Sequence, residues 1–185
     1  MILRRTHEMA GGGDLNPGVV RQLDTGNAIL NVKTQVADYA LDAERLAVLC
    51  AWNGRQEVAL DGRRVFVDDD TWMTVPACPA NVRIRGAREV HALTILFRRG
   101  MPEETLGALI TPEDRLLESG EVMQSAALPF MPHLYTHDRS VTPVLLFIRR
   151  HCEMGLDDAL WYEEQFAFLL ERLLMRHRQV VARAH

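Results

Sequence analysis

The chain has 185 residues, of which 48% are hydrophobic and 25% are charged. This composition is typical of a globular protein, and the length favours one domain, or one domain with an appendage. The 21 basic and 25 acidic residues give a net charge of −4, which argues against a chain that wraps nucleic acid by charge alone.

Cysteine usage and hydropathy point to a reducing compartment. Cys50, Cys78 and Cys152 are widely spaced and form no CxxC pair, which does not suit a disulfide framework. No apolar run is long enough to span a membrane, and the N-terminus lacks the apolar core of a secretion signal. We therefore expect a cytoplasmic protein with no membrane segment.

The chain divides into three parts. Residues 1–18 contain Gly11-Gly12-Gly13 and Asn16-Pro17-Gly18, which interrupt regular structure. They predict a mobile N-terminal arm, either a frayed end or a cover for a ligand. Residues 19–100 alternate short β-type runs with turns, and residues 101–185 have helical periodicity.

A series of short strands fills the β region. Leu46–Trp52 is apolar at both parities, so we expect both of its faces to be buried. Asn53-Gly54 and Asp61-Gly62 are hairpin-type turn signals. The other predicted strands are Asn27–Gln35, Gln56–Leu60, Arg63–Val67, Thr71–Val75, Asn81–Arg85 and Glu89–Phe97. No helix separates them, so the pattern predicts a sandwich or barrel rather than a parallel βαβ sheet.

Four helices are predicted after the strands, with residues 120–139 irregular between the second and third. Three of them begin with a proline or with a cap followed by acidic residues, and Gly155 is a C-terminal cap. The predicted helices are Pro102–Ile110, Thr111 to about Gly120, Thr142–Cys152 and Asp157 to about Ala182.

The longest helix carries a heptad-like apolar seam. The seam consists of Tyr162, Phe166, Leu169, Leu173 and Val180. The short link before this helix makes it an antiparallel hairpin with the preceding one. Both helices either pack on the barrel or offer a face to a second copy. We expect a homodimer formed through this hairpin.

No residue set carries an evident catalytic or metal-binding pattern. The seven histidines form neither a His-x-His pair nor an HExxH motif, and His91 is the only one in the β region. No serine lies in GxSxG, and Cys152 and His151 are neighbours on a helix, where adjacent side chains diverge. We expect no catalytic residues, no metal site and no cofactor.

A small barrel nevertheless has a lumen in which a ligand can bind. Trp52 and Trp72 are the large aromatic residues of the strands, and Arg83, Arg85 and His91 would supply polar contacts if they point inward. The alternative for each tryptophan is ordinary core packing. Trp52, Trp72, Arg83 and His91 are therefore the candidate ligand set, although a period of two does not tell which strand face lines the lumen.

Several blocks of this sequence resemble the sensory half of AraC-type transcription regulators. They are Leu46–Gly54, Leu60–Arg63, Val67–Asp70, Leu96–Gly100, Thr111–Leu117 and Trp161–Leu174. The resemblance covers roughly residues 15–182. It implies a cupin-like jelly roll followed by a dimerising antiparallel helix pair. It also implies, for some members, a small-molecule effector in the barrel under an N-terminal arm.

The resemblance further implies a C-terminal DNA-binding domain with two helix-turn-helix units. This sequence ends at His185, directly after the long helix, so we expect an excised regulatory domain or a natural truncation, with DNA contacted only through the missing domain. The predicted class is α+β: a cupin-like double-stranded β-helix, short helices and a helical hairpin.

The predicted function is that of the effector-sensing, dimerising and non-catalytic domain of a bacterial AraC-family regulator. One alternative is a metal-free cupin enzyme, an isomerase or lyase that acts on a small polar molecule through His91. Another is a stand-alone protein that forms mixed dimers with a complete regulator and blocks it.

Overall fold

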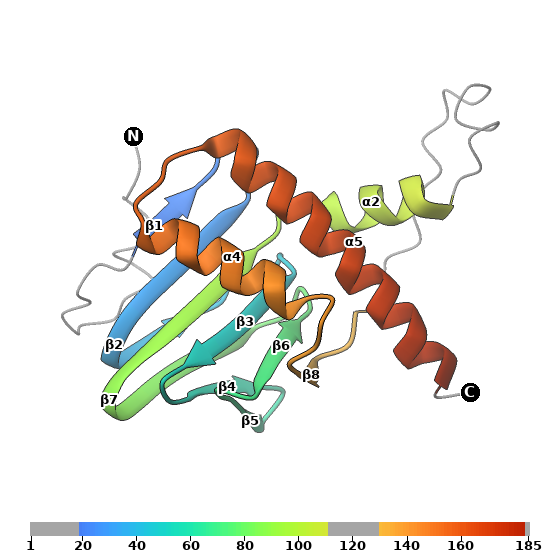
Figure 1. Cartoon of the computed structure of the whole chain (residues 1–185). Helices are drawn as coiled ribbons and strands as arrows, with labels where there is room; N and C mark the ends of the chain where they lie inside the picture. Colours follow the sequence, from blue (N-terminus) through green and yellow to red (C-terminus); the bar gives the residue numbers. More distant parts are fainter. Residues whose placement is uncertain (1–18, 111–129, 184–185) are drawn as a thin grey trace.

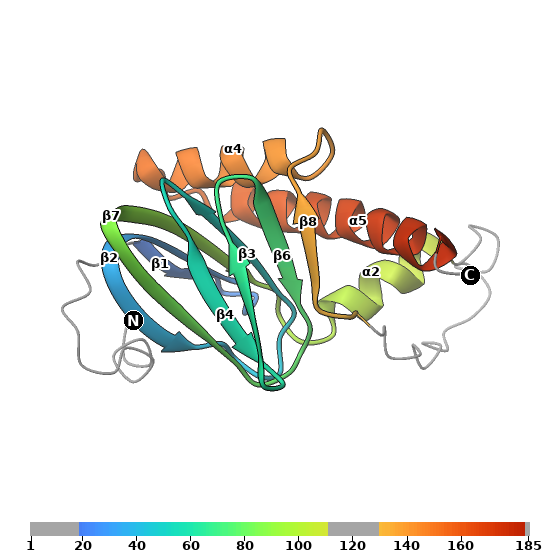
Figure 2. The same ribbon diagram turned by 90° about the horizontal axis from the view of Figure 1, so that it is seen from below.

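The computed structural model of this chain describes residues 19–110 and 130–183. Its described strands form one antiparallel sheet of eight strands that curves into a barrel, with helices lying along one side (Figures 1 and 2). The predicted α+β class with a cupin-like barrel and a C-terminal helical hairpin is confirmed.

The elements follow one another in a simple order. The strands are β1 (Val19–Gln22), β2 (Ala28–Ala40), β3 (Ala47–Trp52), β4 (Gln56–Leu60), β5 (Arg63–Val67), β6 (Thr71–Val75), β7 (Ala80–Leu96) and β8 (His133–Thr136). The helices are α2 (Met101–Ile110), α4 (Thr142–Glu153) and α5 (Ala159–Arg183).

Two long strands, β2 and β7, pair with each other and join the two walls of the barrel. Their register shifts between Thr34 and Val36, a bulge that bends a strand pair. On one side of the bend β7 pairs with β3 through His91–Leu96, and on the other it pairs with β4 through Ala80–Ile84. We call the wall of β3, β6 and β8, with the adjoining halves of β2 and β7, the helix-side wall, and the wall of β4 and β5, with the other halves of β2 and β7, the open wall.

Successive side chains along the strands point to opposite faces of the sheet and so contribute to two separate apolar cores. Leu49 of β3 is fully buried in the barrel interior, together with Val58, Met73, Val82 and Ile84. The neighbouring residues of β3 point the other way, into a core shared with α4 and α5. That second core includes Ile29, Val48, Cys50, Leu93, Ile95, Leu145, Ile148, Phe166 and Leu169. Burial of both faces of Leu46–Trp52, as predicted, is confirmed.

Local signals account for the ends of the two hairpin helices. Pro143 lies in the first turn of α4, and Gly155 ends that helix with a φ of 67°. At the start of α5, a carboxylate oxygen of Asp158 accepts a hydrogen bond from the backbone N–H of Trp161 at 3.0 Å. Both helix starts lie within two residues of the predicted positions.

Three features differ from the sequence-based expectation. The predicted strands Asn81–Arg85 and Glu89–Phe97 belong to the single strand β7, and β1 was not predicted. The segment 120–139 was expected to be irregular, but it contains β8. This strand pairs with β6 and places Tyr135 opposite Trp72. The predicted arm at 1–18 and the predicted helix from Thr111 lie outside the described residues.

Candidate functional site

The barrel interior is a packed apolar core with a few polar groups. The Tyr39 hydroxyl and the Thr94 hydroxyl are hydrogen-bonded at 3.1 Å, and Gln56 Nε2 donates to the carbonyl oxygen of Cys50 at 3.0 Å. Burial raises the pKa of Tyr39 to about 12, so this phenol keeps its proton at neutral pH. The described interior therefore offers a ligand little polar surface beyond the oxygen Gln56 Oε1, which lacks a hydrogen-bond partner.

Trp72 lies outside the barrel, in the core between the sheet and the helices. Its indole is fully buried and stacks on Tyr135 of β8, with ring centroids 4.1 Å apart and an interplanar angle of 12°. Strand parity places the next residue, Met73, in the barrel instead. The expected lumen position of Trp72 is therefore corrected to a core position on the helix side.

Trp52 and His91 also face the helices, as cross-strand neighbours on β3 and β7. The guanidinium carbon of Arg149 lies 4.6 Å from the Trp52 ring centroid, and Arg149 Nη2 is 3.1 Å from His91 Nδ1. Glu153 Oε1 is 3.1 Å from Arg149 Nε and 3.3 Å from the ammonium of Lys33. We call these five residues the α4 clamp.

The electrostatics of the α4 clamp favour a neutral histidine. Burial is the largest cause that lowers the pKa of His91, and the positive charges of Lys33 and Arg149 lower it further. A guanidinium can only donate hydrogen bonds, so His91 Nδ1 must be the acceptor. The α4 clamp thus fastens α4 to the sheet and has no contact with the barrel interior.

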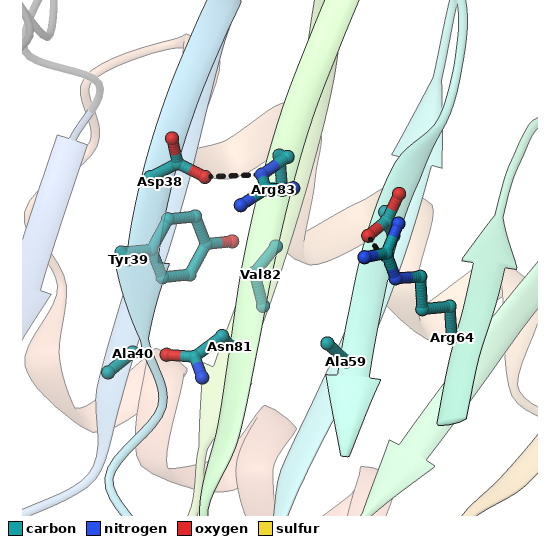
Figure 3. Close-up of a pocket in the computed structure, with 9 residues that line it drawn as sticks. Asp38, Tyr39, Ala40, Ala59, Arg64, Asn81, Val82 and Arg83 are labelled. Atoms are coloured by element: carbon teal, nitrogen blue, oxygen red, sulfur yellow. Dashed lines mark hydrogen bonds and ion pairs between the residues drawn. The ribbon is translucent and has the colours of Figure 1, made fainter. Parts of the chain in front are cut away.

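Arg83 lies on the outer surface of the open wall, beside a groove of about 370 Å³ (Figure 3). Its Nε donates to Asp38 at 3.0 Å, and Arg85 pairs with the same carboxylate. These two hydrogen bonds hold the pKa of Asp38 below its usual value. On the far side of the groove, Arg64 Nε lies 3.6 Å from Glu57 Oε1.

Cross-strand register explains why this groove exists. Asn81 of β7 lies between Ala40 of β2 and Ala59 of β4, so a row of short side chains crosses three strands. The next row places Arg83 between Asp38 and Glu57. The short row is hollow because the side chains next to it on the same face are longer. Figure 3 shows Asp38 and Arg83 in the row beside it and Arg64 at its end.

Of the four candidate ligand residues, the structure brings together only Trp52 and His91. Trp72 lies in the helix-side core, and Arg83 lies on the opposite wall. Sequence reasoning missed Asp38, Glu57, Arg64 and Asn81 as groove residues. The available signal was the alternation of Arg83 and Arg85 with Val82 and Ile84, which marks the arginines as outward-facing.

The heptad-like seam of α5 packs inside the protomer. Tyr162, Phe166, Leu169 and Leu173 are all buried against the helix-side wall, and the side chain of Val180 lies outside the described residues. Of the two alternatives for this seam, packing on the barrel or contact with a second copy, the four described residues show packing on the barrel. A different set of large apolar side chains is exposed on α4, α5 and their link: Leu146, Phe147, Met154, Leu156, Leu160, Phe168 and Met175.

Three further features concern metal binding, membrane spanning and the cysteines. Within residues 19–110 and 130–183, no three His, Cys, Asp or Glu side chains are grouped so that they could hold a metal ion. Among the described helices, none has the length and apolar character to cross a membrane. The three cysteines are free, and Cys50 and Cys152 are buried.

Comparison with known proteins adds information on the fold. No protein-family model and no curated protein matches the sequence. Apo ToxT K231A from Vibrio cholerae matches 86% of this chain at 9% identity, with a TM-score of 0.55, and the match spans 58% of ToxT. At this identity the likeness establishes a shared fold.

Two further structures overlap with smaller scores. The AraC-like transcriptional activator CuxR matches 80% of this chain and 51% of its own, at 8% identity and a TM-score of 0.48. A cupin_2 domain of an XRE family transcriptional regulator from Enterobacter cloacae matches 44% of this chain and 97% of its own, at 17% identity and a TM-score of 0.35.

Proposed function

We propose that this chain is the sensory and dimerising half of a bacterial AraC-type transcription regulator, with no catalytic activity of its own. The carrying observation is the joint arrangement of barrel and helices, which ToxT, an AraC-like regulator, shares over 86% of this chain. The sequence blocks that resemble the AraC sensory half support the same assignment. Because the chain spans 58% of ToxT and has a net charge of −4, we propose that DNA is contacted by a further domain.

We place the dimer contact on the exposed apolar side chains of the helical hairpin. On α5, Leu160, Phe168 and Met175 are eight and seven residues apart, which puts them on one side of the helix. Leu146 and Phe147 add apolar surface from α4. A contiguous apolar patch on a protein surface usually marks an interaction site, and a two-fold dimer would cover the same patch on both copies.

The dimer proposal is tested by two neighbouring substitutions on α5. Phe168→Glu places a charge on the exposed side, so we expect a monomer in analytical ultracentrifugation with unchanged resistance to urea. Leu169→Glu places a charge in the core, so we expect loss of the fold. A wild-type chain that stays monomeric throughout the micromolar range would overturn the proposal.

The enzyme alternative loses the residue on which it depended. His91 points away from the barrel interior and bonds to Arg149. The phenol of Tyr39, which does face the interior, has a pKa raised to about 12 and is therefore a poor base at neutral pH. We accordingly propose a small-molecule effector as an input to the regulator rather than as a substrate.

A further inference from the structure

The outer groove of the open wall has the chemistry of a binding site. Among the described residues, α4 and α5 cover only the helix-side wall (Figure 2). The groove side chains that point outward are exposed or half-buried, and the buried Tyr39 and Val82 lie at its floor. Its volume of about 370 Å³ lies in the range of small-molecule pockets. The groove is lined from four elements, β2, β4, β5 and β7, so the barrel itself fixes its shape.

The charged groups in the groove and at its edge leave a surplus of one positive charge, because Arg85, which does not line the groove, adds to the two pairs within it. Three guanidiniums, those of Arg64, Arg83 and Arg85, surround two carboxylates, those of Asp38 and Glu57. Arg85 donates hydrogen bonds to Asp38 and to the carbonyl oxygens of residues 37 and 84. The surplus therefore resides on Arg64 and Arg83.

Unused hydrogen-bond donors of those two arginines lie at the groove. Each guanidinium has five N–H donors in a planar fork. Within the described part of the chain, Arg83 pairs with Asp38 through Nε, and Arg64 pairs with Glu57 only through a long contact at 3.6 Å. The terminal nitrogens of both therefore remain available. Figure 3 shows the Asn81 side chain beside Ala40, in the row next to the one that holds Asp38 and Arg83.

We propose that this groove binds a small organic acid, whose carboxylate or phosphate oxygens are held by Arg64 and Arg83 and whose neighbouring polar group bonds to Asn81. Planar guanidinium forks match the geometry of such oxyanions and bind them through two parallel hydrogen bonds. The asparagine amide, which has both donors and an acceptor, suits an adjacent hydroxyl or carbonyl group. The site stands on the groove alone and does not require that the chain be a regulator.

The test uses the whole chain and two probes, succinate and inorganic phosphate, titrated at constant ionic strength against sodium chloride. Binding is followed by amide chemical shifts in nuclear magnetic resonance spectra. We expect saturable shifts at Ala40, Ala59 and Asn81 with at least one probe. The stronger probe identifies the ligand as a carboxylate or a phosphate.

Matched arginine variants separate a site from general attraction. Arg64→Gln and Arg83→Gln remove groove donors, and each is expected to weaken binding about tenfold or more, the effect of one charge-assisted hydrogen bond. Arg63→Gln removes an exposed arginine of the same strand that does not line the groove, so it should leave affinity unchanged.

Equal losses in Arg63→Gln and Arg64→Gln, or shifts that sodium chloride reproduces, would overturn the proposed site. A groove variant that changes only the sedimentation of the chain would also overturn it and would identify the open wall as a protein contact. Phe168→Glu should bind the probe normally, because its position lies on the helix side. Failure of the dimer proposal and failure of the groove proposal are therefore distinguishable.

Discussion

Arg149 of α4 donates a hydrogen bond to Nδ1 of His91 on β7, with the two nitrogens 3.1 Å apart. This bond forms only while Nδ1 carries no proton. Besides Arg149, the charged groups that act on His91 are Lys33 of β2, Glu153 of α4 and Glu89 of its own strand. Protonation of His91 would break the bond and place a third positive charge in the α4 clamp, so α4 should be held less firmly in acid.

The stability of the fold should therefore fall as His91 becomes protonated. The pKa of His91 is lower in the folded chain than its ordinary value of 6.5, so the unfolded chain binds this proton more tightly. Its contribution is fully present above about pH 6.5 and is lost as the pH falls through the lowered folded value. We expect urea unfolding at about pH 5.5 to show lower stability than at about pH 7.5.

His91→Gln provides the control for this pH dependence. The glutamine carbonyl can accept the bond from Arg149 but does not titrate, so the pH dependence should flatten. His133, whose pKa is lowered mainly by burial, titrates in both proteins and cancels in the difference. Superimposable pH profiles for wild type and His91→Gln would contradict the prediction.

Removal of the Trp72 indole should damage the fold strongly. Trp72 is fully buried and stacks on Tyr135, so Trp72→Ala leaves a cavity and should cost about 3–5 kcal/mol in urea unfolding. Trp52→Ala is the comparison, because Trp52 is only half-buried and its contact with Arg149 contributes about 1 kcal/mol. A greater loss at Trp52 than at Trp72 would show that the assigned burial is wrong.

Asn27 should not tolerate replacement by its acid. Its fully buried amide donates from Nδ2 to Glu163 at 2.7 Å and accepts at Oδ1 from the backbone N–H of Arg98 at 2.8 Å. Asn27→Asp would set two carboxylates against each other and should cost about 2 kcal/mol or more at neutral pH. The loss should shrink in acid, where a protonated carboxyl can donate again.

A second substitution checks the cause of that loss. In the double variant Asn27→Asp, Glu163→Gln, the donor and acceptor exchange places, so much of the stability should return in a urea double-mutant cycle. A double variant no more stable than Asn27→Asp alone would assign the loss to something other than the Glu163 contact.

Two glycines in turns should differ in their response to alanine. Gly54 has a φ of 148°, and an added Cβ would lie 2.8 Å from Val90 Cγ2. Gly62 has a φ of 72°, with no atom within 4 Å of such a Cβ. Gly62→Ala should cost about 1 kcal/mol through backbone strain alone, and Gly54→Ala about 2–3 kcal/mol. Equal melting temperatures for the two variants would contradict this difference.

Local chemistry made much of the β region predictable. Asp61-Gly62 joins β4 to β5 as a tight hairpin, with Leu60 opposite Arg63. Asn53-Gly54 is also a turn with positive φ at both residues, but the strands that it joins do not pair. Its backbone N–H groups donate to the carboxylate of Asp69 at 2.6 and 3.1 Å, and the chain passes from one wall to the other.

Periodicity did not reveal what covers each face. A period of two separates Trp72 from Met73, but it does not tell which of them meets the helices and which enters the barrel. A heptad seam likewise marks a buried helix face, and the structure buries Leu169 against its own barrel. The groove could not be predicted from the sequence for a related reason. Asp38 and Arg83 are 45 residues apart, and only the pairing register of β2 and β7 brings them into contact.

Strand β8 has a consequence for how this architecture can be divided. Its four residues come from the helical half of the chain, yet they complete the sheet edge along β6 and cover Trp72 with Tyr135. A fragment cut near residue 100 would leave that indole facing water and β6 as an unpaired apolar edge strand. Such an edge promotes aggregation. The barrel and the helices should therefore fold as one unit, and neither half should be stable when the chain is divided between them.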